Sequence, residues 1–97
     1  MPKGYWIVRG EVSDPEGYKA YVAANAEAFR KYGARFLVRG GMFEPVEGES
    51  KSRNVVIEFK DHPTALACYR SPDYQAAKAL RQGKAEADLV IIEAYGA

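Results

Sequence analysis

Two charged residues interrupt apolar runs near the middle of the chain, and they are the first candidates for chemistry. Arg39 stands in the run FLVRGG, and Glu58 stands in the run RNVVIEF. Both runs are typical of β-strands, in which alternate residues point to opposite faces, so Arg39 and Glu58 are expected to share one face of a sheet. A guanidinium offers a two-pronged donor to carboxylates. The pair therefore predicts either a site for a small anionic or polar ligand or a structural ion pair.

His62 is the only histidine of the chain. Imidazole is the side chain whose ordinary pKa lies near neutrality, so His62 is a candidate for proton transfer. Arg39 is the second candidate catalytic residue, because its guanidinium could position a substrate. His62 directly follows an expected strand and starts an expected helix. The alternative is a simple turn, in which the imidazole caps the helix or lies in solvent.

A second group of candidates lies in the segment YRSPDY and just after it. Tyr69, Tyr74 and Arg81 fall on an interrupted helical segment, and Arg81 lies two turns beyond Tyr74 on nearly the same side. Aromatic rings, a hydroxyl and a guanidinium would suit a small aromatic or carboxylate ligand. Packing of helices on a sheet explains the same tyrosines, so both interpretations stay open.

Composition argues against several other classes of protein. One histidine, one cysteine (Cys68) and no calcium-loop pattern predict no metal site, and the absence of a nucleotide fingerprint predicts no cofactor. A net charge of +1 with interspersed signs argues against nucleic-acid binding. No apolar run approaches the roughly 20 residues that span a bilayer, and a lone thiol fits a reducing compartment. We therefore expect a cytoplasmic protein that does not bind membranes.

The strands and helices that position these residues can be predicted from the periodicity of the apolar residues and from the capping and turn residues between them. We expect one domain over residues 1–97, because 97 residues is an ordinary single-domain length. Asp14 and Ser71 are expected helix caps, while Gly33 and Gly83 are expected helix stops. The expected strands cover 5–12, 35–40, 53–59 and 87–95, and the expected helices cover 16–32, 63–70 and 72–82. This β-α-β-β-α-β order predicts an α+β, ferredoxin-like fold with a four-stranded antiparallel sheet and its helices on one face.

Counting alternate positions predicts two different faces of that sheet. One face holds no charge and is expected under the helices, where an unpaired ion would be costly; its members are Trp6, Val8, Gly10, Val12, Phe36, Val38, Gly40, Val55, Ile57, Phe59, Val90, Ile92 and Ala94. The other face is too apolar for solvent and predicts an interaction surface; its members are Tyr5, Ile7, Arg9, Glu11, Leu37, Arg39, Val56, Glu58, Leu89, Ile91, Glu93 and Tyr95. We expect a homodimer that packs two such faces together with paired interfacial charges, or else a monomer with an irregular solvent face.

The ordered set GYWIV, FLVRGG, RNVVIEF, YRSPDY, Arg81 and DLVIIEAYG resembles the domain-of-unknown-function 1330 family, within the dimeric α+β barrel superfamily. The resemblance covers nearly the whole chain. It implies a ferredoxin-like fold and a dimer with facing sheets, but no established reaction. The wider superfamily includes cofactor-free monooxygenases, muconolactone isomerases and haem-binding dismutases, so the fold does not settle the function.

Three functions are consistent with these patterns. The first is a homodimer that binds a small molecule in a pocket between sheet and helices. The second is a cofactor-independent monooxygenase or isomerase that acts on small aromatic or polyketide-like substrates. The third is a purely structural dimer. No residue in the sequence requires the second function.

Overall fold

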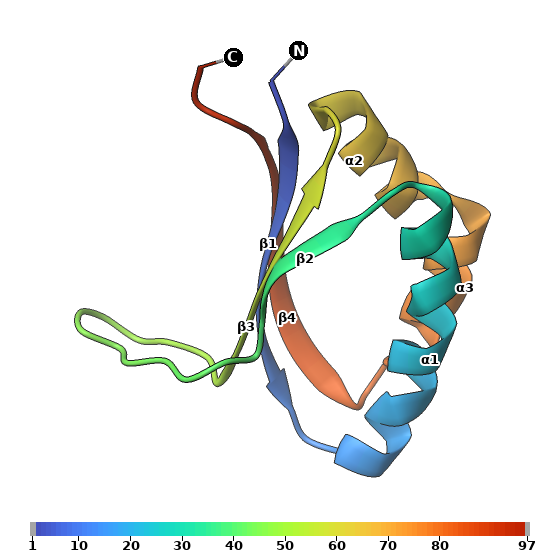
Figure 1. Cartoon of the computed structure of the whole chain (residues 1–97). Coiled ribbons are helices and arrows are strands. Elements are labelled where there is room, and N and C mark those ends of the chain that lie inside the picture. Colours follow the sequence, from blue (N-terminus) through green and yellow to red (C-terminus); the bar gives the residue numbers. More distant parts are fainter. Residues whose placement is uncertain (1, 97) are drawn as a thin grey trace.

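The computed structural model describes residues 2–96 and contains one four-stranded antiparallel sheet with three helices on one side (Figure 1). The second connection between strands holds two short helices in place of one, so the order is β-α-β-β-α-α-β. This confirms the ferredoxin-like, α+β prediction. The elements are β1 (Gly4–Val12), α1 (Pro15–Lys31), β2 (Arg35–Arg39), β3 (Arg53–Phe59), α2 (His62–Arg70), α3 (Pro72–Ala79) and β4 (Ala85–Glu93).

Local chemistry sets the helix ends. The Asp14 side chain accepts a hydrogen bond of 3.1 Å from the amide of Gly17 and caps α1. At the other end Gly33 has φ +70°, and the amides of Gly33 and Ala34 return to the carbonyls of Arg30 and Phe29. That pattern is a Schellman cap, which needs a left-handed residue after the helix. Ser71 separates α2 from α3 and caps α3 through the amide of Tyr74.

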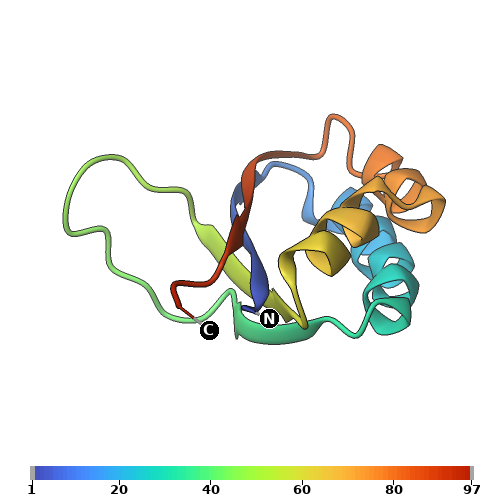
Figure 2. The same ribbon diagram turned by 90° about the horizontal axis from the view of Figure 1, so that it is seen from above.

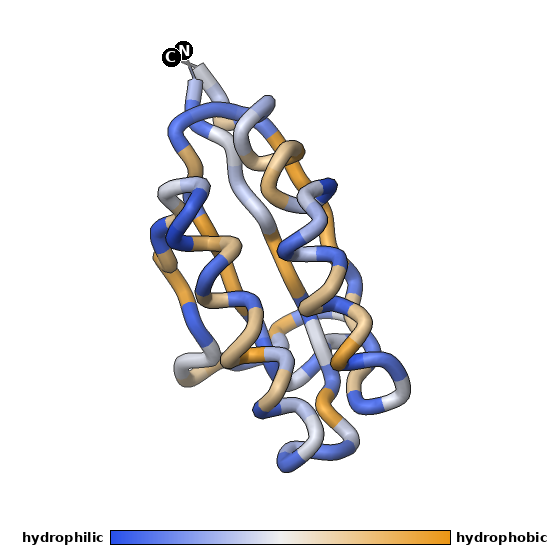
Figure 3. Tube along the Cα trace, turned by 90° about the vertical axis from the view of Figure 1, so that its right-hand side faces the viewer, coloured by the Kyte–Doolittle hydropathy of each residue, from blue (hydrophilic) through white to orange (hydrophobic). Residues whose placement is uncertain are grey.

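The sheet order is β2-β3-β1-β4, so β1 and β3 are central and β2 and β4 are the edges. All three helices cover the same face, which we call the covered face, and leave the opposite, open face without a protein layer (Figure 1). In Figure 3, which looks from the helix side, apolar stretches of the strands lie behind the helices. The fold is thus a two-layer structure with one unpartnered sheet surface.

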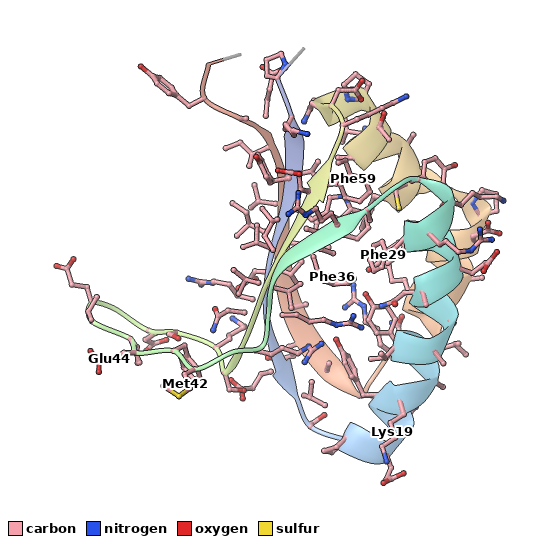
Figure 4. All side chains as sticks on the ribbon, in the orientation of Figure 1. Lys19, Phe29, Phe36, Met42, Glu44 and Phe59 are labelled. Atoms are coloured by element: carbon pink, nitrogen blue, oxygen red, sulfur yellow. The ribbon has the colours of Figure 1, made fainter. Side chains whose placement is uncertain are left out.

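Trp6 lies at the centre of the core between the layers. Its ring packs edge-on against Phe29 and Tyr74, with centroids 5.2 and 4.9 Å away. Its Nε1 donates a hydrogen bond of 2.9 Å to the carbonyl of Ala65 in α2. Figure 4 shows Phe29, Phe36 and Phe59 in the same space between sheet and helices. Aromatic packing and one satisfied indole N–H therefore hold the helices on the sheet.

A β-bulge in β2 overturns the prediction that Arg39 lies on the open face with Glu58. Phe36 pairs with Ile57, but the register then shifts, so that Val38 pairs with Val56 and Arg39 with Val55. Val55 is buried under the helices. One extra residue in β2 moves Arg39 to the covered face and Val38 to the open face, which simple alternation could not predict.

The assignment of faces in β4 was also wrong. Leu89 pairs with Val8 and Ile91 with Trp6, so both belong to the covered face, where they pack against the core. Val90 and Ile92 instead lie on the open face, 55% and 48% exposed. The run from Leu89 to Ile92 is apolar throughout, so its sequence carries no alternation to reveal the face. Pairing with β1 decides it.

The pairing also assigns three further strand residues to a face of the sheet. Glu93, expected on the open face, pairs with Gly4, which shares the alternation of Trp6, and Glu93 is exposed at the sheet end. Tyr5 and Glu58 pair across β1 and β3 on the open face, as expected.

The connection between β2 and β3, residues 40–52, projects away from the helices (Figure 2). In Figure 4 its residues Met42 and Glu44 lie on the side of the sheet opposite to the helices. Met42 and Val46 are fully or largely exposed, and Phe43 is half-exposed. We call residues 40–52 the arm, because it carries apolar side chains beyond the open face.

No helix between residues 2 and 96 is long and apolar enough to cross a membrane.

Candidate functional site

A cavity lies between the covered face and helices α1 and α3, at the end of the sheet where β1 finishes and β4 begins. Its free volume is about 40 Å³, several times the roughly 10–15 Å³ that one water needs. The wall is mainly aromatic and aliphatic, with polar residues from α1, α3, β2, β3, β4 and the turn after α3. The polar and aromatic lining residues are Trp6, Tyr18, Tyr21, Asn25, Phe29, Phe36, Arg39, Arg53, Tyr74, Arg81 and Glu86.

Two tyrosines and one arginine form the helical side of the cavity. The hydroxyls of Tyr21 and Tyr74 lie 2.8 Å apart in a buried hydrogen bond. The guanidinium carbon of Arg81 lies 5.2 Å from the ring centroid of Tyr21, in a cation–π arrangement. Burial raises the pKa of Tyr74 well above its ordinary value, and the Tyr21 hydroxyl acts in the same direction. Tyr74 therefore stays neutral and serves as a hydrogen-bonding group, not as a base.

Two more arginines come from the sheet side. The guanidinium carbon of Arg39 lies 4.1 Å from the Phe36 ring centroid, and that of Arg53 lies 5.8 Å from the Tyr18 ring centroid. Arg53 is half-buried, whereas Arg39 is exposed at the edge of the cavity. Burial raises the pKa of the Tyr18 hydroxyl, and the positive charge of Arg53 partly offsets that rise. Each guanidinium is thus held over an aromatic ring beside the cavity.

Asn25 is the amide of the cavity wall. It is only 6% exposed, and its Oδ1 is shielded from solvent without a hydrogen-bond donor. Nε of Arg81 is likewise buried without a partner. Buried polar groups in folded proteins are normally hydrogen-bonded. Two unsatisfied groups in one cavity wall therefore mark it as a place for a ligand or ordered solvent.

The structure brings together only part of the predicted site. Tyr74, Arg81 and Arg39 line the cavity, but Tyr69 does not. The Tyr69 ring packs edge-on against Trp6 with centroids 5.8 Å apart, and its hydroxyl accepts a hydrogen bond of 3.0 Å from Lys78. Packing in the core accounts for Tyr69.

His62 also lies outside the cavity lining. It is the first residue of α2, next to Gly4, and its Nδ1 is buried without a hydrogen-bond partner. The Asp61 side chain caps this helix by accepting a hydrogen bond of 2.8 Å from the amide of Thr64. The single imidazole of the chain is thus not available for proton transfer inside the cavity.

Sequence reasoning missed Asn25, Arg53 and Tyr18 as site residues. Asn25 did carry a usable signal, because it is the polar member of the otherwise apolar stripe of α1. Tyr21 is buried and also contributes its hydroxyl to the cavity wall. Arg53 gave no such signal, since its face depends on the sheet register.

The charges of the open face form a separate network. The Tyr5 hydroxyl donates a hydrogen bond of 3.1 Å to Glu58, and Lys3 lies 3.8 Å from the same carboxylate. Arg9 lies 3.9 Å from Asp88. Glu58 is therefore partnered without Arg39, and the expected pair of Arg39 with Glu58 does not form within the chain. Between residues 2 and 96 no three potential metal-ligating side chains gather in one place.

Solved structures show the same fold at low sequence identity. A protein of unknown function from Rhodopseudomonas palustris superposes with a TM-score of 0.77 at 15% identity, covering 99% of this chain and 85% of that one. SnoaB, a cofactor-independent oxygenase from Streptomyces nogalater, gives 0.67 at 14% identity, with 100% and 97% covered. A dimeric ferredoxin-like protein of unknown function from Thermobifida fusca gives 0.64 at 15% identity, with 96% and 92% covered. These likenesses establish the fold alone.

No curated protein matches the sequence. The family model of the domain of unknown function DUF1330 matches residues 3–95, which is nearly the whole chain. Together with the ferredoxin-like fold, this confirms the resemblance found in the sequence. The chain belongs to the DUF1330 family.

Proposed function

We propose that this protein is a homodimer that binds a small molecule in the cavity between the covered face and the helices. The observation that carries the binding function is the pair of unsatisfied polar groups, Asn25 Oδ1 and Arg81 Nε, in the wall of that cavity. Leaving such groups unpaired in the interior costs stability, and folds retain that cost mostly at functional sites. A ligand that makes these hydrogen bonds would recover the lost stability.

The open face supports association with a second copy. Five apolar side chains on it, namely Ile7, Leu37, Val38, Val90 and Ile92, are each between 42% and 55% exposed. A patch of this kind on a sheet marks an interaction surface, and two-fold symmetry lets one such surface cover its own copy. The arm projects on the same side (Figure 2), so its apolar residues would contact the partner.

A dimeric relative supports the same conclusion. The Thermobifida fusca protein of this fold is described as dimeric. Light scattering should therefore give a molar mass of twice the 10.7 kDa of one chain. A mass of 10.7 kDa at micromolar concentration would contradict the dimer and leave the binding proposal to be judged separately.

Ligand-observed NMR with a mixed library of small neutral, cationic and anionic compounds tests the binding function. The matched control is Gly10→Val, which adds a side chain on the covered face at the cavity wall. A Cβ at Gly10 would meet its nearest atom, the carbonyl of Glu86, at an ordinary 3.4 Å, and circular dichroism verifies that the valine variant folds. Binding to the wild type that Gly10→Val abolishes would support the proposal. If no compound of any class binds, the purely structural dimer is the better account.

The likeness to SnoaB, a cofactor-independent oxygenase, favours one alternative activity. Such a reaction would turn a substrate CH₂ group and O₂ into a carbonyl and water, with the substrate supplying the electrons. In the cavity, arginines would stabilise the substrate anion that forms when the CH₂ group loses a proton to solvent water. Oxygen uptake with a hydroxylated aromatic ketone, abolished by Arg81→Met, would support this activity. Uptake equal to that of buffer would exclude it for that substrate.

A further inference from the structure

Three arginines converge on the cavity from separate parts of the chain. Arg39 ends β2, Arg53 starts β3, and Arg81 lies in the turn after α3. The six ion pairs formed among residues 2–96 involve other cations, so none of the three guanidinium groups has a carboxylate partner there. Aromatic rings hold all three, as described above. The cavity is therefore a site of concentrated positive charge.

Among the described residues that line the cavity, Glu86 alone carries a carboxylate, and it does not neutralise this charge. Glu86 pairs with Glu11 of β1, whose alternation places it on the open face, opposite to Trp6. Glu11 itself accepts hydrogen bonds from the amide and hydroxyl of Ser52 on that face. Paired residues of an antiparallel ladder share a face, so the Glu86 side chain belongs to the open side as well. The positive charge inside the cavity is left without a counter-charge from residues 2–96.

The donors and acceptors in the cavity wall further restrict the chemical class of the ligand. Guanidinium groups only donate, so they call for acceptor oxygens, and a carboxylate accepts two parallel bonds from one of them. The Tyr21 and Tyr74 hydroxyls already bond to each other. Asn25 Oδ1 is the buried acceptor that lacks a donor. Rotation of the amide presents either its oxygen or its nitrogen to the cavity, and the oxygen would accept from a ligand hydroxyl.

We infer that the ligand of this cavity is a small hydroxylated carboxylate, with its carboxylate on the arginines and its hydroxyl donated to Asn25. This inference rests on the proposed binding function and names its ligand class. The free volume of about 40 Å³ matches the polar head of such a molecule. Any larger remainder extends past the exposed Arg39 towards solvent.

Trp6 provides a direct reporter, because it is the only tryptophan of the chain and lies in the cavity wall. Its fluorescence is titrated at constant ionic strength with lactate, propanoate and lactamide. Propanoate lacks only the hydroxyl, and lactamide lacks only the charge. We expect lactate to bind at least fivefold more tightly than propanoate and at least tenfold more tightly than lactamide, because each analogue leaves a buried group unpaired.

Substitutions test which residues contact the carboxylate and the hydroxyl of the ligand. Arg81→Met should weaken lactate at least tenfold, and Asn25→Leu should lower lactate to the affinity of propanoate without changing propanoate. Arg9→Met is the matched control, since Arg9 lies on the open face next to Asp88, and it should bind lactate as the wild type does. Circular dichroism verifies folding. If Arg81→Met fails to fold, the comparison of the three ligands on the wild type decides alone.

The outcomes separate this inference from the proposed function. Lactamide binding as tightly as lactate overturns the selection for charge, and propanoate binding as tightly as lactate overturns the contact with Asn25. If library compounds bind in the cavity and no carboxylate does, the inference is wrong while the binding function stands. If nothing binds, both are wrong.

Discussion

The two faces of one sheet carry opposite kinds of irregularity. The space between the covered face and the helices holds charge and unsatisfied polar groups where a core would be apolar, as Arg81 and Asn25 show. The open face holds apolar side chains where solvent would favour polar ones, as Val90 and Ile92 show. A sheet with a single role needs neither departure. Under the proposed function, each departure has its own explanation, a small molecule on the covered side and a second subunit on the open side.

The largest expected difference between the regions concerns two phenylalanines. Phe29 is 5% exposed against Trp6, and Phe43 is 50% exposed on the arm. Phe29→Ala should lower the free energy of unfolding by about 3–5 kcal/mol, because it removes buried apolar contacts and leaves a cavity in the core. Phe43→Ala should change it by less than about 0.5 kcal/mol in dilute protein. Urea unfolding followed by circular dichroism measures both.

Equal losses for the two variants would contradict this division. A large loss for Phe43→Ala alone would place the folding core on the arm.

A charge on the open face should act on association. Val90→Lys places an ammonium twice in a two-fold interface and should raise the dimer dissociation constant at least about tenfold, since burying an unpaired charge is costly. Leu80→Lys is the matched control, because Leu80 is 45% exposed on the helix side. Light scattering across a dilution series measures the shift. A dimer weakened by Leu80→Lys and not by Val90→Lys would move the interface to the helices.

The tyrosine pair of the cavity gives a smaller effect with a distinct pH signature. Tyr74→Phe should cost about 1 kcal/mol at neutral pH, because Tyr21 loses its buried partner. Burial raises the pKa of folded Tyr74 above 10.0, so the contribution of its neutral form is complete below pH 10 and is lost as pH rises towards the folded pKa. The wild type should thus lose stability above pH 10 more steeply than Tyr74→Phe.

Tyr5→Phe is the control on the open face. Burial also raises the pKa of Tyr5, helped by its bond to Glu58, but the hydroxyl is far less enclosed. This variant should retain most of the alkaline slope of the wild type, measured by urea midpoints between pH 8 and 11. Identical slopes for the wild type and Tyr74→Phe would show that Tyr74 ionises freely.

The smallest expected effect on stability contrasts two sulfur atoms. Cys68 is fully buried on α2, and burial raises the pKa of its thiol to about 12, so a disulfide reagent at pH 8 should leave it unmodified in the folded protein. Met42 on the arm is fully exposed and should oxidise readily, with less than about 0.5 kcal/mol change in unfolding free energy. Mass spectrometry measures both. Rapid modification of Cys68 would mean that the core opens on the timescale of labelling.

The order of elements could be predicted from the sequence because its signals are local. Asp14, Ser71 and Gly33 occupy the cap positions that their chemistry favours. The faces of the strands were harder, because they depend on pairing. The bulge before Val38 reversed the position of Arg39, and the unbroken apolar run of β4 hid which residues face the core.

The candidate site was only partly predictable for the same reason. Tyr74 and Arg81 share a local segment, so their common location could be anticipated. Arg53 and Asn25 reach the cavity through sheet register and helix packing, which no local spacing encodes. Tyr69 shows the converse, since its sequence context fits a pocket while its ring fills the core.

The most direct test of the two-face account is a ¹⁵N–¹H correlation spectrum of the labelled protein with and without lactate. The account predicts that lactate shifts the side-chain amide of Asn25 and the Nε–H of Arg81, while the backbone amides of Val90 and Ile92 stay in place. Shifts at Val90 and Ile92 with none at Asn25 and Arg81 would contradict it, because the ligand would then occupy the face assigned to the second subunit.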